Sequence, residues 1–457
     1  MVDLLIRLLN DVWRVLPLLA IVAALFLLVT SRASARLFST FDDSPDSPAT
    51  WLLLVGVLGG LLLSGALERR RSGPSPFETL PGAGRILSLF AGPRISYALC
   101  LLACFAVVHA LALSRRQGYG RWGRASLVGW AFLTAVVTFV KAEDPPDQAL
   151  LDLAATTLAF VAVLLLASHL TVDHLRSVVA LIGVLLLIVN AYSLRTASSW
   201  ATTTDWPGGF LEGERFQGTM PQPNVAGLVF ACIFVFGMAN LRRAPVLWGL
   251  VVVGAASFIG LSGSRGAVAV AVGGIAYVFL RRVTVRVVPL TAATMIVLAS
   301  VVPFTALADA EVIHGRDVTW HGTIDLISRA PFFGSGSYPP VGAMGQSSFY
   351  AHNQVLQTLA ESGVVGLVLL LGALLGAFWR KESASVTEWS AVFYGLILTI
   401  PFENPLRLFE PSFGLVPAIF AIAVAVAAST DESSPDTGRP SRRARLETPT
   451  EQWQRLA

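Results

Sequence analysis

The sequence predicts an all-α, polytopic integral membrane protein. Of its 457 residues, 54% are hydrophobic and only 14% are charged. With a mean hydropathy of +0.67, this balance is far from that of a soluble globular protein. Apolar runs of roughly 15 to 25 residues recur along the chain, each about long enough to cross a ~30 Å hydrocarbon layer as a helix. A transmembrane β-barrel would show weaker, alternating segments, so these continuous runs favour helices.

The runs predict about 12 to 13 transmembrane helices in a membrane domain that covers residues 1–429. The candidate spans are residues 15–30, 51–67, 96–114, 125–140, 149–167, 178–193, 225–241, 245–261, 266–281, 286–307, 353–379, 386–401 and 412–429. Residues 30–36 only loosely match a signal-peptide cleavage site, so we expect the first run to remain as an anchor. Residues 430–457 are rich in Ser, Pro, Thr and charge, which predicts a disordered cytoplasmic tail.

The distribution of Arg and Lys predicts which connections face the cytoplasm. Basic connections alternate with poorly basic ones, and the positive-inside rule assigns the basic set to the cytoplasm. That set comprises 115–124, 242–243, 281–286, 380–381 and the tail, whereas 141–148, 194–224, 262–265, 308–352 and 402–411 are predicted to be external. Before residue 115 the alternation fails once, which leaves open a missed half-span near 80–93 or an exception to the rule.

Residues 308–352 form the one large external loop. We expect a short helix at Arg316–Arg329, followed by a run of helix-breaking residues at 330–336. A loop of this length is usually either functional or disordered. Its aromatic, Gly and Pro content, with few charges, favours an ordered lid on the membrane face.

Four polar clusters lie on the predicted external side, at or near the ends of spans: residues 215–224, 262–266, 316–320 and 352–353. Arg215, Arg265 and Arg316 stand where positive charge is not needed to set topology. The planar guanidinium fork suits bidentate contact with phosphate oxygens, so two or three such arginines would hold a diphosphate. Each arginine alone could equally be a snorkelling or topology-setting charge.

His352 lies at the boundary between this loop and the next span. An imidazole can exchange a proton with a hydroxyl or phosphate near neutral pH, so His352 is a candidate general base. Alone, it could instead be an interfacial residue beside an N-cap at Asn353. We expect Gly363 and Gly366 to let another helix pack closely behind it.

Acidic residues near the membrane are further candidates, since an intramembrane charge is functional by default. Glu361 could orient a partner or pair with an arginine. Nothing in the sequence pairs Asp152 or Glu403 with the polar clusters.

The run His352-Asn353, nine residues, Gly363, two residues and Gly366 resembles the H-[NSQ]-x9-G-x-x-[GTY] signature of the bacterial O-antigen ligase and polymerase family. Supporting pieces are similar in kind and order: Arg-x-x-Gly-Thr…Pro-x-Pro-Asn at 215–224, Ser-x-Ser-Arg-Gly at 262–266, and Gly315-Arg316…Trp320 leading to Pro331-x-x-Gly334-x-Gly336. The resemblance covers roughly residues 210–380.

This resemblance implies a GT-C-like membrane glycosyltransferase of the bacterial cytoplasmic membrane, metal-independent and without a cofactor, that serves polysaccharide biosynthesis in the cell envelope. The donor would be a glycan on a polyprenyl diphosphate at the outer leaflet, and the acceptor a hydroxyl of a glycan, lipid or cell-wall component. Membrane lipids are the other expected partners, and no nucleic acid is. His352 would be the base and Arg215 and Arg265 would bind the diphosphate, with Arg316 matched only by its place in the loop. Asn224, Asn353, Glu361, Gly363 and Gly366 would support the site.

The sequence is compatible with three functions. The first is a ligase that moves a glycan from its lipid carrier to an acceptor hydroxyl. The second is a polymerase of the same family, whose acceptor is another lipid-linked repeat unit. The third is a transporter or flippase of lipid-linked glycan, which would predict broken helices in paired halves and polar residues at mid-membrane.

Overall fold

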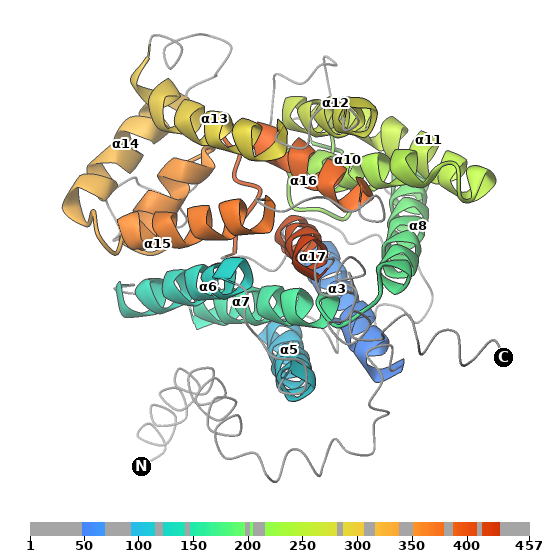
Figure 1. Cartoon of the computed structure of the whole chain (residues 1–457), viewed down its shortest axis with the longest axis horizontal. Helices are drawn as coiled ribbons and strands as arrows, with labels where there is room; N and C mark the ends of the chain where they lie inside the picture. Colours follow the sequence, from blue (N-terminus) through green and yellow to red (C-terminus); the bar gives the residue numbers. More distant parts are fainter. Residues whose placement is uncertain are drawn as a thin grey trace, which may run out of the picture.

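The computed structural model describes residues 48–68, 93–114, 122–141, 147–196, 202–203, 215–280, 287–305, 316–337, 351–378, 387–408 and 414–429, and confirms an all-α, multi-spanning fold (Figure 1). Its helices are α3 (Pro48–Glu68), α5 (Pro93–Ser114), α6 (Trp122–Lys141), α7 (Asp147–Ala167), α8 (Val172–Thr196), α10 (Pro223–Asn240), α11 (Pro245–Ser262), α12 (Arg265–Leu280), α13 (Val287–Val301), α14 (Arg316–Arg329), α15 (Gln354–Phe378), α16 (Thr387–Thr399) and α17 (Leu415–Ser429). A 3-10 turn, η3 (Val302–Phe304), follows α13, and the short strands β1 (Thr202–Thr203) and β2 (Arg215–Phe216) pair antiparallel.

Each candidate span from 51–67 to 412–429 coincides with one of these helices, and the helix predicted at Arg316–Arg329 is confirmed as α14. The candidate at 15–30, the region 69–92 and the tail at 430–457 lie outside the described residues. Seven helices of the described chain are long and apolar enough to cross a membrane: α5, α6, α7, α8, α10, α11 and α15. The 13 residues of α16 rise only about 20 Å, so the predicted number of helices is not a number of full-length spans.

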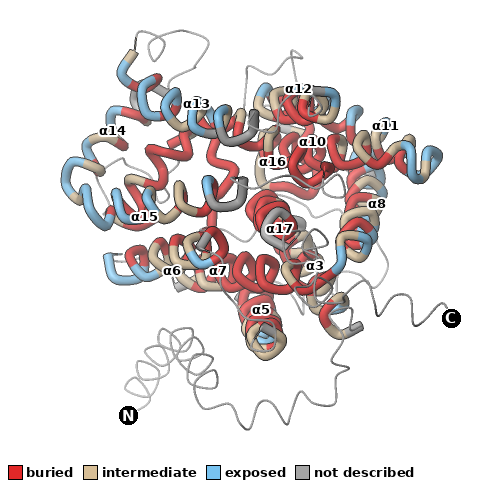
Figure 2. The backbone as a smooth tube through the Cα atoms, viewed as in Figure 1, coloured by how far each residue is buried: buried red, intermediate tan, exposed pale blue. Residues whose placement is uncertain are grey.

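The most buried helices lie in the middle of the bundle. Figure 2 shows α7, α10 and α17 largely buried, whereas α11, α13 and α14 carry exposed residues on their outer sides. The exposed side of α11 is apolar, with Val246, Leu250 and Val253 directed outward. Such a surface would promote aggregation in water but is matched to lipid tails, as expected for a membrane helix.

Two groups of polar residues mark opposite ends of the bundle. One end lies away from the candidate site and is called the opposite end. There, Asp173 forms ion pairs with Arg176 and with Arg243, at 2.5 and 3.5 Å, and Arg176 also pairs with Glu388. At the other, the site end, residues 215–224, 262–266, 351–354 and 401–404 meet. Helix α10 runs between the two ends, and its 18 residues rise about 27 Å. This grouping agrees with the predicted alternation of sides, and the external placement of the site end stays a prediction.

Candidate functional site

Arg215 is held in the site end by contacts on two sides. It lies on β2 and is buried, with Nε donating to the carbonyl oxygen of Ser262 at 2.8 Å and Nη2 donating to Oδ1 of Asn224 at 2.7 Å. Ser262 ends α11 and Asn224 lies in the first turn of α10, so the guanidinium ties these two helices to the strand. A guanidinium has five N–H donors, and these bonds use two of them.

Asn224 continues this polar chain to Glu403. Its Nδ2 donates to Oε1 of Glu403 at 3.3 Å, and Oε2 of Glu403 lies 3.6 Å from Nδ1 of His352. The Glu403 side chain is 5% exposed and the His352 side chain 21% exposed, so the carboxylate lies behind the imidazole. Ser262, Arg215, Asn224, Glu403 and His352 thus form one continuous chain of contacts drawn from four segments of sequence.

His352 has a strained backbone conformation. Its φ is 49°, and within the described part of the chain no other non-glycine residue has a positive φ. Such a conformation costs about 1–3 kcal/mol and persists only where the surroundings fix it. The next residue, Asn353, is fixed because its Oδ1 caps α15 by accepting from the N–H of Leu356 at 3.0 Å, while its Nδ2 donates to the carbonyl oxygen of Ala299 at 2.8 Å. These bonds help to hold the backbone of His352 in this conformation.

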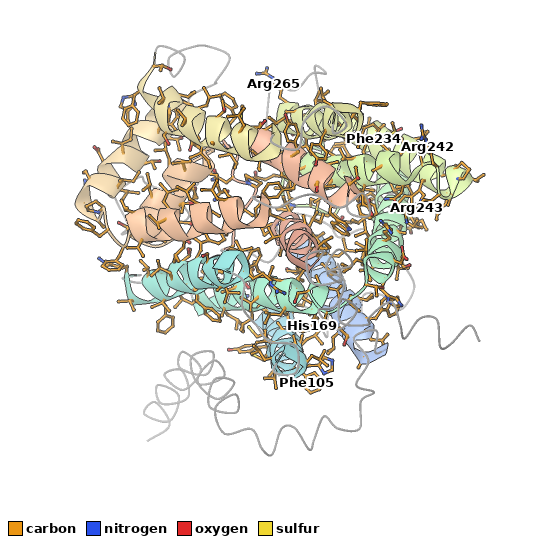
Figure 3. The ribbon with its side chains drawn as sticks, in the orientation of Figure 1. Phe105, His169, Phe234, Arg242, Arg243 and Arg265 are labelled. Carbon is orange, nitrogen blue, oxygen red and sulfur yellow. The ribbon has the colours of Figure 1, made fainter. Side chains whose placement is uncertain are left out.

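Arg265 and Glu403 shape the electrostatics around Arg215. Burial lowers the pKa of Arg215, the negative charge of Glu403 raises it, and the positive charge of Arg265 lowers it. Arg265 is exposed at the start of α12 and extends away from the helices at the top of Figure 3. Its neighbour Gly266 lies against Glu403, because a Cβ on this glycine would stand 3.2 Å from Cγ of Glu403. Arg215, Arg265 and Glu403 therefore act on one another electrostatically at the site end.

Not every predicted site residue joins this chain. Arg316 begins α14, and its side chain lies outside what the structure describes. Four residues further on, Trp320 donates from Nε1 to the carbonyl oxygen of Ala351 at 2.8 Å, so α14 is attached beside His352. Glu361 is buried one layer deeper, with Gln357 donating to it at 2.5 Å and the charge of Arg407 acting on it. Asp152 lies elsewhere, bonded to Ser96 and Gln148.

The expected role of Gly363 in helix packing is wrong. Its φ of 65° and ψ of −166° break α15, and a Cβ there would lie 2.2 Å from the backbone of Phe332. The turn at 331–336 docks into this break: Ser335 and Gly336 donate to the carbonyl oxygens of Ala360 and Glu361, and Val364 and Val365 donate to those of Pro331 and Phe332. Gly366, in contrast, lies beside α6, because a Cβ there would stand 1.9 Å from Oγ of Ser362 on α15 and 3.7 Å from Cδ1 of Trp130 on α6.

Sequence reasoning missed the buried polar residues behind His352. Gln357, Asn404 and Arg407 are all buried at the site end, and none was singled out. The polar run from Glu403 to Arg407 inside an apolar, predicted external connection was a usable signal, because such residues are costly near a membrane unless they are paired. Within the described ranges, no three His, Cys, Asp or Glu side chains gather as a metal-ion site.

Residues 250–371 match the family model described as O-antigen ligase. This part of the chain is similar to O-antigen ligases. This match includes Arg265, Arg316 and the segment from His352 to Gly366, whereas Arg215, Asn224 and Glu403 lie outside it. Members of the O-antigen ligase family are glycosyltransferase-like ligases or polymerases that act on lipid-linked glycans in membranes. No curated protein and no solved structure gives a match.

Proposed function

We propose that this protein transfers an oligo- or polysaccharide from a polyprenyl-diphosphate carrier to an acceptor hydroxyl at the outer face of the bacterial cytoplasmic membrane. The observation that carries the proposal is the continuous chain from Arg215 through Asn224 and Glu403 to His352. This chain supports the proposal because it connects His352, the proposed base, to Arg215, the proposed diphosphate-binding cation, through the side chains of Glu403 and Asn224. The similarity to O-antigen ligases supports the same chemistry.

His352 is the proposed base. Because Nδ1 faces Glu403, the tautomer with its proton on Nδ1 leaves the lone pair of Nε2 for the acceptor hydroxyl. The hydroxyl proton passes to Nε2 while the acceptor oxygen bonds to the anomeric carbon. Glu403 then stabilises the imidazolium that has formed, as the buried acid does in a Ser-His-Asp triad. The step needs no metal and no cofactor.

Arg215 and Arg265 are the proposed diphosphate-binding residues. As the bond between the anomeric carbon and the diphosphate oxygen breaks, the electron pair stays on the leaving group, and negative charge grows there. Cations fixed in place before the reaction stabilise that charge most in a water-poor site. Attack from the face opposite the diphosphate inverts the anomeric carbon. Arg316, at the start of α14, is proposed as a further cation for the same leaving group.

A polymerase differs from a ligase only in its acceptor, which is a second lipid-linked repeat unit. Transport is the competing class, and α15 does carry a break of the kind that transporters use. The backbone groups at that break are bonded to the turn at 331–336, however, and do not face a transport path. The similarity to O-antigen ligases favours transfer.

The test is to reconstitute the purified protein in liposomes with polyprenyl-diphosphate glycans extracted from the cells that make it. We expect free polyprenyl diphosphate to be released as donor is consumed. Glycan chains that lengthen by whole repeat units would identify a polymerase, and single transfer to an added acceptor lipid or glycan a ligase. If intact donor crosses to the other leaflet without release of diphosphate, the protein is a transporter and the proposal is wrong.

A further inference from the structure

We infer that Gln357 and Glu361, one turn apart on α15, are positioning residues that fix His352 against Glu403. This inference rests on the proposed function, in which His352 is the base. Both side chains are buried, and Gln357 bonds to Ala351 and Asn404, the chain neighbours of His352 and Glu403. They act through the residues that flank the reacting pair.

Gln357 binds one neighbour of each member of the pair. Its Oε1 accepts from the backbone N–H of Ala351 at 2.8 Å and from Nδ2 of Asn404, also at 2.8 Å. Ala351 precedes His352 in the chain and Asn404 follows Glu403. A single amide oxygen therefore connects the segment that carries the base to the segment that carries its acid.

Glu361 decides which end of the Gln357 amide faces those two donors. A carboxylate only accepts hydrogen bonds, so the amide end that faces Glu361 must be the NH₂ group, and Nε2 of Gln357 donates to Oε1 of Glu361 at 2.5 Å. With Nε2 committed, Oε1 must point to Ala351 and Asn404. Glu361 is itself held by Ser337, whose N–H is bound by Thr138 of α6 at 2.9 Å.

The strain at His352 explains why such a support is needed. A non-glycine residue with a φ of 49° relaxes unless both of its neighbours are fixed. Asn353 is fixed by its cap and by α13, and Ala351 is fixed on its carbonyl side by Trp320 and on its N–H side by Gln357. Loss of the Gln357 bond releases Ala351 and lets the imidazole turn away from Glu403.

Gln354 provides a matched comparison on the same helix. It is equally buried, but its Oε1 accepts from the N–H of Leu406 and its Nε2 donates to Thr358. Among the described residues, its side-chain hydrogen bonds therefore go to Leu406 and Thr358 and not to Ala351 or Asn404. Comparing substitutions of the two glutamines therefore distinguishes an effect on the stability of α15 from an effect on the pair His352 and Glu403.

The experiment measures kcat and donor KM in the reconstituted transfer assay for Gln357→Met, Glu361→Gln, and the exchange that combines Gln357→Glu with Glu361→Gln. Methionine keeps the volume and removes every hydrogen bond, so kcat should fall about tenfold or more while donor KM stays near that of the parent. The exchange reverses donor and acceptor between the two positions and keeps both bonds to Ala351 and Asn404. It should restore most of kcat.

The control Gln354→Met should lower thermal stability without the loss of kcat seen for Gln357→Met. If Gln357→Met does not fold, the exchange still decides the question. An exchange variant that stays as slow as Gln357→Met, or that does not fold, overturns the inference. If His352→Ala turned over as fast as the parent protein, the proposed function itself would be wrong. Failure of the inference and failure of the proposed function are therefore distinguishable.

Discussion

The Nδ1 atom of His352 lies 3.6 Å from Oε2 of Glu403, and the opposite oxygen of that carboxylate accepts from Asn224. One buried acid thus joins the start of α15 to the start of α10. The distance is longer than a hydrogen bond, and catalytic contacts often shorten only when substrate binds.

Glu403→Gln should lower kcat by about 10²-fold or more, because the amide keeps the shape of the side chain but cannot stabilise an imidazolium. Turnover per folded protein and donor binding are the measurements. Glu388→Gln is the matched control: Glu388 is also buried, lies at the other end of α16, and pairs with Arg176 away from the site. If Glu403→Gln turns over as fast as the control, the carboxylate has no part in the reaction.

Arg215→Lys should be nearly as damaging as Arg215→Ala, because an ammonium cannot bond to both Ser262 and Asn224 and also present a fork to phosphate. Arg265→Lys should likewise resemble Arg265→Ala. The readouts are donor affinity and kcat, with Arg243→Lys at the opposite end as the control. Recovery of activity by lysine at both site positions would mean that these residues act only as point charges.

Gly363→Ala should destabilise the protein by more than the 1–3 kcal/mol of backbone strain alone, because the new Cβ would also meet the backbone of Phe332. Thermal unfolding in detergent measures the change. Gly260→Ala is the control: a Cβ there meets nothing within 4 Å and lies within helix α11, so this change should be neutral or stabilising. Equal effects at both positions would argue against the break in α15.

A cysteine at Ser347 should react with an impermeant thiol reagent added outside intact cells, whereas cysteines at Arg243 and Ser434 should be protected. The background must lack Cys100, Cys104 and Cys232. If the cysteines at Arg243 and Ser434 were labelled and the one at Ser347 were not, the site end would face the cytoplasm, where lipid-linked donors are assembled. The reaction would then be a cytoplasmic one.

Local patterns in the sequence predicted the helices of this protein, but they did not predict the contacts between residues far apart in the chain. The lengths of the apolar runs located the membrane helices. The bounds of α14 follow from its polar residues and from the helix-breaking residues 330–336 that come after it. The pairing of Glu403 with His352 could not be predicted, because it depends on how α15 and α16 return to the same end. Gly363 was misassigned because a glycine in an apolar run is compatible with both close helix packing and a backbone break.

The most direct test of the central claim is the turnover of His352→Ala beside its binding of donor, both measured in liposomes with the extracted lipid-linked glycans. The base is needed only when the acceptor attacks, so we predict that donor binding is kept while release of polyprenyl diphosphate falls by roughly 10²-fold or more. Near-parental release from a folded His352→Ala protein would contradict the account.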